Sequence, residues 1–486
     1  MQVQNTTSNR ADLSPKLTTQ GLSLAALVAL VVGSMIGSGI FALPSQMAGS
    51  AAPGPLLIGW LITGAGMLML AFVFQSLASR KPDIDGGVYG YARAGFGNYI
   101  GFTSAWGYWL SAWIGNVSYL VLLMATLGYF FPAFEGGNTV AAVAGASVVL
   151  WLVHLLTLRG VRGAAFVNVI VTIAKVVPIL TFVAIAAVGF KAGIFTADFW
   201  GENAGLGGTM TQVKSMMLVT VWVFIGIEGA SVYSKRARTR SDVGRATLLG
   251  FLGVLALLLA VNLLSYGLMA QAKLAKVADP SMAGLLKHEV GAWGAGFISI
   301  GLIISLLGAL ISWVLLCVEI LHLPAVDHVM PAVLAKENKY GAPAPALWLT
   351  TACVQLMLLW TLKNGNTYLD LLYLATSLIL LPYLWSAAYQ LKLALSGETY
   401  SGSDRNRDLF VGFIALVYAV WLVYAGGWQY VLVAALFYLV GTAIYVWARK
   451  EAKLPVFTKP EIAAVAVVAL TSVIALVGMN AGWLSV

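Results

Sequence analysis

The chain has 486 residues, of which 60% are hydrophobic and only 10% are charged, and its mean hydropathy is +0.87. Because soluble domains carry about 25% charged residues, this composition excludes a soluble enzyme and predicts an all-α integral membrane protein with many spans. The formal net charge of +9 agrees with basic loops beside anionic lipid, and it does not indicate a nucleic-acid partner.

Thirteen apolar runs are long enough to cross a hydrocarbon layer of about 30 Å. They lie near 22–45, 54–79, 98–130, 139–158, 163–190, 213–233, 246–271, 291–323, 344–362, 367–394, 408–426, 428–448 and 461–484. The first run follows a polar segment and is longer than the apolar region of a signal peptide. We therefore expect it to remain as a span behind a cytoplasmic tail of residues 1–21.

Lys and Arg favour cytoplasmic loops, and most of the 28 such residues fall on one side of the membrane when the N-terminus is placed inside. We expect a multi-pass protein of a bacterial-type cytoplasmic (inner) membrane, with the N-terminus in the cytoplasm and the C-terminus outside. Cys317 and Cys353 both fall within apolar runs. This position predicts packing residues and supports neither a disulfide framework nor a metal site.

Two of the apolar runs contain clustered glycines, GSMIGSGIF at 33–41 and FIGIEG at 224–229. Glycine weakens a helix, and a helix broken at membrane depth is tolerated where its backbone lines a cavity or is buried. Because such paired interruptions indicate a transporter's binding site, we expect repeats at 22–190 and 213–394, with additional helices at 408–486. The alternative is close helix packing through small residues.

Glu228 is a carboxylate inside an otherwise mostly apolar stretch, residues 218–230. A charged side chain in the bilayer core costs at least a few kcal/mol, so it indicates a functional site. In one hypothesis Glu228 lies near a cation pathway, charged when a cation is bound and protonated when the site is empty. In the other it is a permanent acceptor for groups of the second or seventh helix.

The sequence contains neither an HExxH motif nor a GxxxxGK[ST] phosphate-binding loop. We therefore expect no enzyme activity, no cofactor and no metal. An amino acid sensor or channel would require a regulatory domain or a continuous charged pore, and neither the N-terminal tail nor any loop supplies one.

Five segments together resemble a known family. They are GSMIGSGIF at 33–41, GGVYGYAR at 86–93, WVFIGIEGAS at 222–231, YGAP at 340–343 and SKRARTRSDVGRAT at 234–247. These segments are similar to the amino acid/polyamine/organocation (APC) superfamily, and within it to the basic amino acid antiporters, in particular the arginine:ornithine antiporters. The resemblance covers essentially the whole chain, including the thirteenth span.

The resemblance implies a LeuT-like fold with five-plus-five inverted repeats and discontinuous helices one and six. It also implies exchange of cationic amino acids by alternating access, with arginine against ornithine as the main pair. Proton-coupled transport stays open, as does exchange of lysine for cadaverine, arginine for agmatine, histidine for histamine or tyrosine for tyramine. The expected partners are the substrate and the lipid bilayer, and a homodimer is left open.

The two broken helices can meet both ends of an amino acid, because free N–H groups suit a carboxylate and freed carbonyls suit an ammonium. By the resemblance, the backbone and hydroxyl of Ser38 with Gly37 and Gly39 hold the carboxylate, and Met35 is a further substrate-binding residue. The carbonyl groups around Trp222, Val223 and Ile225 hold the α-amino group.

For the cationic side chain, the resemblance implies stacking on Trp313 and a hydrogen bond between the substrate's distal group and Asn116. Where some relatives have a cysteine near Asn116, this chain has Ala112, so that contact is missing. The aromatic residues that match gating positions are Tyr108, Trp222, Trp313 and Tyr383. The alternative for any one of them is an interface anchor or a packing residue.

Lys175 is a second charge inside an apolar run. Superfamily relatives that dispense with sodium can place a lysine ammonium between helices one, five and eight, near where the ion would sit. On this interpretation Lys175 is a sodium surrogate that can also carry a proton. The alternative is a lysine that binds a backbone carbonyl and only ties helix one to helix five.

Overall fold

The computed structural model describes residues 24–159, 164–228, 240–365, 367–402 and 404–484, and every regular element in these ranges is a helix. Eleven helices among them are long and apolar enough to cross a membrane. They are α3 (Pro53–Arg80), α5 (Asn98–Leu127), α6 (Val140–Leu158), α7 (Ala164–Gly189), α11 (Arg240–Leu268), α14 (Ala292–Val326), α15 (Ala344–Asn364), α16 (Tyr368–Ser396), α17 (Asp404–Ala425), α18 (Trp428–Glu451) and α19 (Lys459–Asn480).

The two remaining predicted spans are interrupted helices. The first consists of α1 (Leu24–Met35) and α2 (Gly39–Ser50). The sixth contains α9 (Thr209–Trp222), after which the chain continues in turns to Glu228, and the end of this predicted span, residues 229–233, lies outside the described residues. The eleven continuous helices and these two make the thirteen predicted spans. The predictions of an all-α protein and of discontinuous first and sixth helices are therefore confirmed. The predicted tail, 1–21, lies outside the described residues.

Glycine allows the two interruptions to meet. A Cβ atom on Gly39 would lie 2.7 Å from Val223 Cγ1 and 2.9 Å from Trp222 Cδ1, so a larger residue would push the segments apart. Gly226 has a φ of +108°, a backbone conformation that residues with a side chain rarely adopt. The glycine clusters thus serve both close packing and the helix breaks.

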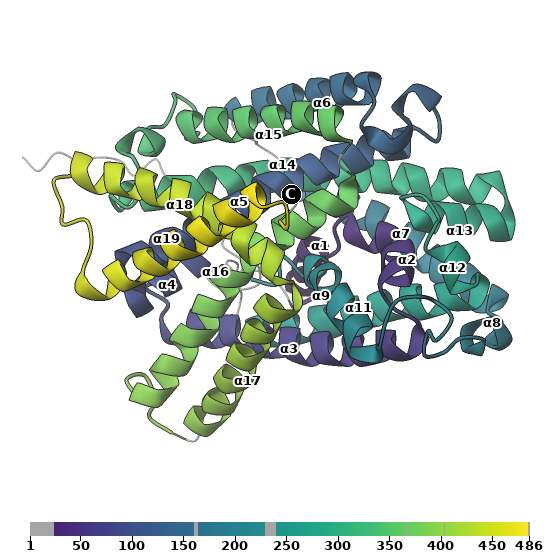
Figure 1. The fold of residues 1–486 in the computed structure, drawn as a ribbon, viewed down its shortest axis with the longest axis horizontal. Helices are drawn as coiled ribbons and strands as arrows, with labels where there is room; N and C mark the ends of the chain where they lie inside the picture. Colours follow the sequence, from purple (N-terminus) through teal and green to yellow (C-terminus); the bar gives the residue numbers. More distant parts are fainter. Residues whose placement is uncertain (1–23, 160–163, 229–239, 366, 403, 485–486) are drawn as a thin grey trace, which may run out of the picture.

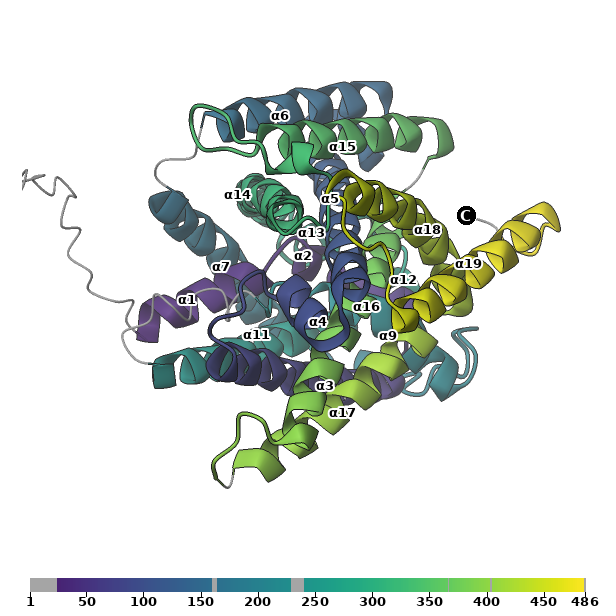
Figure 2. The same ribbon diagram turned by 90° about the vertical axis from the view of Figure 1, so that its left-hand side faces the viewer.

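Helix α5 forms the centre of the bundle, and the other spans surround it. The most apolar stretch of α5 is 89% buried, whereas that of α19 is only 17% buried. Figures 1 and 2 show α6 and α15 side by side along one face and α3 with α17 along the opposite face. Residues on α5 are therefore the ones most protected from lipid.

Short helices mark the two ends of the bundle. At one end lies α4 (Val88–Phe96), and at the other lie α8 (Ala192–Thr196), α12 (Gln271–Leu274) and α13 (Ser281–Val290) (Figure 1). We call these ends the α4 side and the α13 side. Two 3-10 helices, η1 (Pro132–Gly137) and η3 (Ala332–Ala335), complete the described connections.

The segment before α13 holds α2 in place. Asp279 accepts hydrogen bonds from Ser45 Oγ at 3.1 Å and from Gln46 Nε2 at 3.2 Å. Tyr266 of α11 donates to the Ala51 carbonyl at 2.6 Å. Burial raises the pKa of Asp279 from 3.8 to about 6, although the two hydrogen bonds oppose this shift.

This raised pKa predicts a pH-dependent stability. Between pH 4 and pH 6 the folded protein binds a proton on Asp279 that the unfolded chain has released, so the free energy of unfolding falls as the pH rises through this window and stays lower above it. We expect Asp279→Asn to remove part of the decrease in melting temperature between pH 4 and pH 7. Thermal unfolding in detergent measures this, with exposed Glu202→Gln as the matched control. Parallel pH profiles for wild type and Asp279→Asn would contradict the prediction.

Candidate functional site

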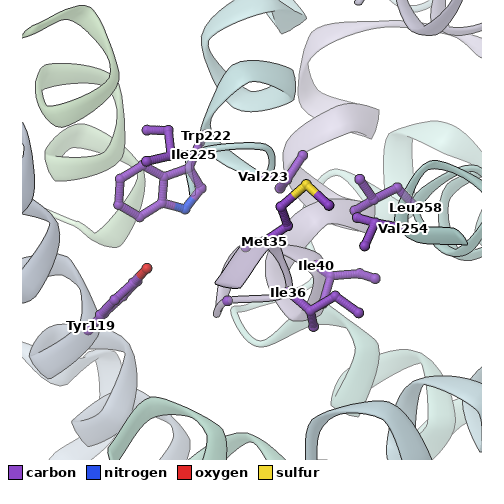
Figure 3. A pocket seen from close by; sticks show the side chains of 11 residues that line it. Met35, Ile36, Ile40, Tyr119, Trp222, Val223, Ile225, Val254 and Leu258 are labelled. Carbon is purple, nitrogen blue, oxygen red and sulfur yellow. The ribbon is translucent and has the colours of Figure 1, made fainter. Parts of the chain in front are cut away.

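Two adjoining cavities lie where the interrupted helices meet α5. The first is lined by six of the residues that the sequence predicts, Met35, Gly37, Gly39, Trp222, Val223 and Ile225. Its other walls come from α5 and α11, and Figure 3 shows Tyr119 of α5 on the opposite side of this space from Met35.

The second cavity is lined by Ser111, Ala112, Gly115 and Trp313. It shares Tyr119, Trp222 and Ile225 with the first. These three side chains therefore separate one space beside the helix-one break from another beside Trp313.

The start of α2 gives the first cavity a positive end. The first N–H groups of a helix have no carbonyl partner within it and carry a partial positive charge, so this end suits an anion. Ser38, at the N-cap, is fully buried, and its hydroxyl shares a hydrogen bond of 3.2 Å with the Tyr368 hydroxyl. Ser38 thus lies at the predicted break, but its side chain points to α16.

Trp222 is held from two sides. Its Nε1 donates a hydrogen bond to the Tyr368 hydroxyl at 3.0 Å. Its ring meets Tyr119 edge-on, with centroids 5.9 Å apart and planes at 62°. Because Tyr368 also bonds Ser38, the side chains of Ser38, Tyr368 and Trp222 form one hydrogen-bonded group, which we call the Trp222 cluster.

The sequence did not identify Tyr119 or Tyr368. Tyr119 follows Ala112 and Asn116 at helical spacing, so all three lie on one face of α5, and this periodicity was the available signal. Tyr368 begins α16 and carries no comparable pattern. With 19 tyrosines in the chain, a single one gives no signal without its neighbours.

Of the two residues expected to contact the cationic side chain, Asn116 and Trp313, only Trp313 lines a cavity. Asn116 is fully buried, and its Nδ2 donates to Cys317 Sγ at 3.6 Å. Among the described residues, the Asn116 Oδ1 atom has no hydrogen-bond partner. Trp313 packs edge-on against Tyr108, with ring centroids 6.5 Å apart.

Glu228 accepts hydrogen bonds from two tyrosines on different helices. Its Oε1 accepts from the Tyr108 hydroxyl at 2.6 Å, and its Oε2 accepts from the Tyr383 hydroxyl at 2.8 Å. Oε2 also accepts from the Gly226 backbone N–H at 3.1 Å. The structure thus brings together three residues that the sequence predicted separately, and we call them the Glu228 cluster. These tyrosines belong to the third and tenth spans, not the second or seventh.

Lys175 is 4% exposed, and its Nζ donates to the Gly33 carbonyl at 3.0 Å. Gly33 lies in the last turn of α1, just before the break. Close to Lys175, Pro178 packs against Gly301 of α14. The Lys175 ammonium therefore ties the first span to the fifth, and α14 packs on α7 within one turn of this residue.

Comparison with known proteins identifies the family. Residues 22–480 match the model of the amino acid permease family. The chain belongs to the amino acid permease family. This membership agrees with the LeuT-like arrangement of five plus five helices, and it makes the chain a membrane transporter of amino acids.

Three relatives show the range of the family around this permease. An arginine/ornithine antiporter of Pseudomonas aeruginosa is 56% identical over 96% of this chain and 99% of its own length. An L-lysine transport protein of Corynebacterium glutamicum is 43% identical over 96% of this chain and 97% of its own length. An arginine/agmatine antiporter of Chlamydia caviae is 39% identical over 94% of this chain and 96% of its own length.

The Glu228 cluster of the permease predicts the effect of a neutral isostere. Glu228→Gln keeps the size of the side chain but replaces a charged acceptor with an amide. A bound cation then has no carboxylate to pair with when the cluster opens. Because a hydrogen bond to a charged group contributes about 1.5–3 kcal/mol, substrate exchange is expected to slow at least about tenfold. The measurement is uptake by purified protein in liposomes from pH 5 to pH 8, with Glu202→Gln as the exposed control. Unchanged affinity and rate over this range would remove Glu228 from the mechanism.

Proposed function

We propose that this permease exchanges cationic amino acids across a bacterial cytoplasmic membrane by alternating access, with arginine against ornithine as the main pair. The observation that carries the proposal is the pair of cavities beside the two interrupted helices, with Trp222 lining both of them and Trp313 lining the second. Tyr108 of the Glu228 cluster packs against Trp313. The arginine/ornithine antiporter at 56% identity supports this pair of substrates.

In this proposal the substrate's carboxylate binds at the start of α2, beside Gly37 and Gly39, and its α-amino group binds carbonyls after Trp222. The cationic side chain extends into the second cavity and lies against Trp313, where a desolvated cation on an indole gains about 2 kcal/mol. Asn116 Oδ1, which has no partner in the part of the chain that the structure describes, is a neutral acceptor for the distal N–H groups. Ala112 leaves room there, where a larger side chain would narrow the cavity.

In this proposal the Trp222 cluster and the Glu228 cluster act as the two gates of the transporter. The Trp222 cluster joins α2, α9 and α16 on the α13 side of the cavities, and the Glu228 cluster joins α5, α16 and the sixth span on the other side. Opening either side requires breaking hydrogen bonds inside a low-dielectric interior. A bound cation offsets part of that cost by giving carboxylate and carbonyl groups a new partner, so the loaded carrier reorients faster than the empty one.

We place the N-terminus and the α4 side in the cytoplasm, because basic residues gather there, among them Arg80, Lys81 and Arg93. The C-terminus is then outside.

The division into repeats at 22–190 and 213–394, with 408–486 appended, belongs to the same proposal. A homodimer stays a prediction, which the molecular mass of the purified protein in detergent tests. The proposed function involves no nucleic-acid partner.

The decisive experiment uses liposomes loaded with ornithine, lysine, agmatine, cadaverine or buffer alone. We expect labelled arginine to enter ornithine-loaded vesicles much faster than empty ones, because only the loaded carrier reorients. Equal filling of empty vesicles would contradict obligatory exchange. Uptake into empty vesicles that follows an imposed pH gradient would favour the proton-coupled alternative, and faster uptake against an amine would favour amino acid/amine exchange.

Lys175 provides a separate test. Lys175→Met retains the length of the side chain but leaves the Gly33 carbonyl without its ammonium partner. We expect the exchange rate to fall at least about tenfold, the effect of losing one charged hydrogen bond. The wild-type rate should be equal in sodium and choline buffers. The control is Lys214→Met, whose ammonium lies over the exposed Tyr424 ring. A normal rate for Lys175→Met, or a sodium-dependent wild type, would refute this role.

A further inference from the structure

The Tyr119 side chain occupies the centre of the site but has no assigned role. It lines both cavities, and its residue is 7% exposed. Its ring is fixed edge-on against Trp222, and the far edge of that indole packs on Gly115 one turn earlier in α5. Figure 3 shows the hydroxyl directed into the space between Trp222 and the helix-one break. The ring is thus positioned by packing, and the hydroxyl is presented to the cavity.

The hydroxyl lies directly beside the backbone of the break. A Cβ atom on Gly37 would be 3.2 Å from Tyr119 Oη. Within the described parts of the chain this hydroxyl makes no hydrogen bond, although its neighbour Tyr368 makes two. A buried tyrosine hydroxyl usually finds a partner, and leaving one unmade costs free energy. The geometry therefore leaves a donor free at the point where the positive end of α2 faces the cavity.

We propose that Tyr119 is a specificity-determining residue, whose hydroxyl donates a hydrogen bond to the α-carboxylate of the substrate. This assignment rests on the proposed function, because it takes the helix-one break as the carboxylate site. A carboxylate accepts an O–H donor strongly in a dry site. An amine produced by decarboxylation offers no acceptor there, so it leaves both the hydroxyl and the α2 N–H groups unpaired. Tyr119 thus favours amino acids over the corresponding amines.

The test compares Tyr119→Phe with the wild type. This change removes only the hydroxyl and keeps the ring that packs on Trp222. Affinities are measured by displacement of a labelled amino acid from purified protein, using the pairs arginine/agmatine, lysine/cadaverine, histidine/histamine and tyrosine/tyramine. We expect Tyr119→Phe to bind the amino acid about tenfold more weakly than the wild type does, while its affinity for the matched amine stays the same. The selectivity ratio should then fall about tenfold.

Two further variants make the result unambiguous. Tyr445→Phe is the matched control, because Tyr445 is fully buried in α18, lines neither cavity and has no hydrogen-bond partner among the described residues. Its selectivity ratio should equal that of the wild type. Tyr119→Met replaces the phenol ring with an apolar side chain that has no hydroxyl. It should lose the selectivity for amino acids over amines, as Tyr119→Phe does.

The outcomes separate this assignment from the proposed function. Equal losses for amino acid and amine would mean that the hydroxyl only supports the structure, and an unchanged ratio would equally overturn the assignment. A wild type that binds tyrosine or histidine but neither arginine nor ornithine would refute the proposed substrates. The affinity ratio of that amino acid to its amine would still test the role of Tyr119. Binding of none of the four pairs would overturn both.

Discussion

The fold depends on one constraint, that a backbone interrupted at membrane depth must find hydrogen-bond partners without water. This protein interrupts two spans, and a buried charged side chain supplies a hydrogen-bond partner near each break. Lys175 donates to the Gly33 carbonyl at the end of α1, and Glu228 accepts from the Gly226 N–H. Lys175 and Glu228, two buried charged residues, therefore lie beside the two irregular segments. Each charge gains a hydrogen bond there that a regular helix would not provide.

The same constraint explains how the site is bounded. Buried hydroxyls and indoles satisfy one another in the Trp222 cluster, and two tyrosines satisfy the carboxylate in the Glu228 cluster. Between these satisfied groups, Asn116 Oδ1 and the Tyr119 hydroxyl have no partner among the described residues. Buried polar groups are normally paired. Their position next to the interrupted helices fits a site completed by a zwitterionic, cationic ligand.

Hydrophobic runs predicted the membrane class and the spans, because the length of an apolar run is a local property of the chain. Glycine clusters located the two interruptions for a similar local reason. The partners of Glu228 could not be predicted in this way. Tyr108 and Tyr383 are separated from it by 120 and 155 positions, and nothing in their local sequence marks them as hydrogen-bonded to a carboxylate. The resemblance to a family suggested them as gating residues, but not that they share one acceptor.

The sequence by itself therefore determined the thirteen spans, the two breaks and the presence of buried charges at Lys175 and Glu228. Only the tertiary structure decided which groups those charges meet, and that Tyr119 and Tyr368 belong to the site. The physical reason is that apolar length and helix breaking act within a few turns of chain, whereas a hydrogen bond such as Ser38 to Tyr368 joins residues 330 positions apart. Such contacts exist only once the helices have packed.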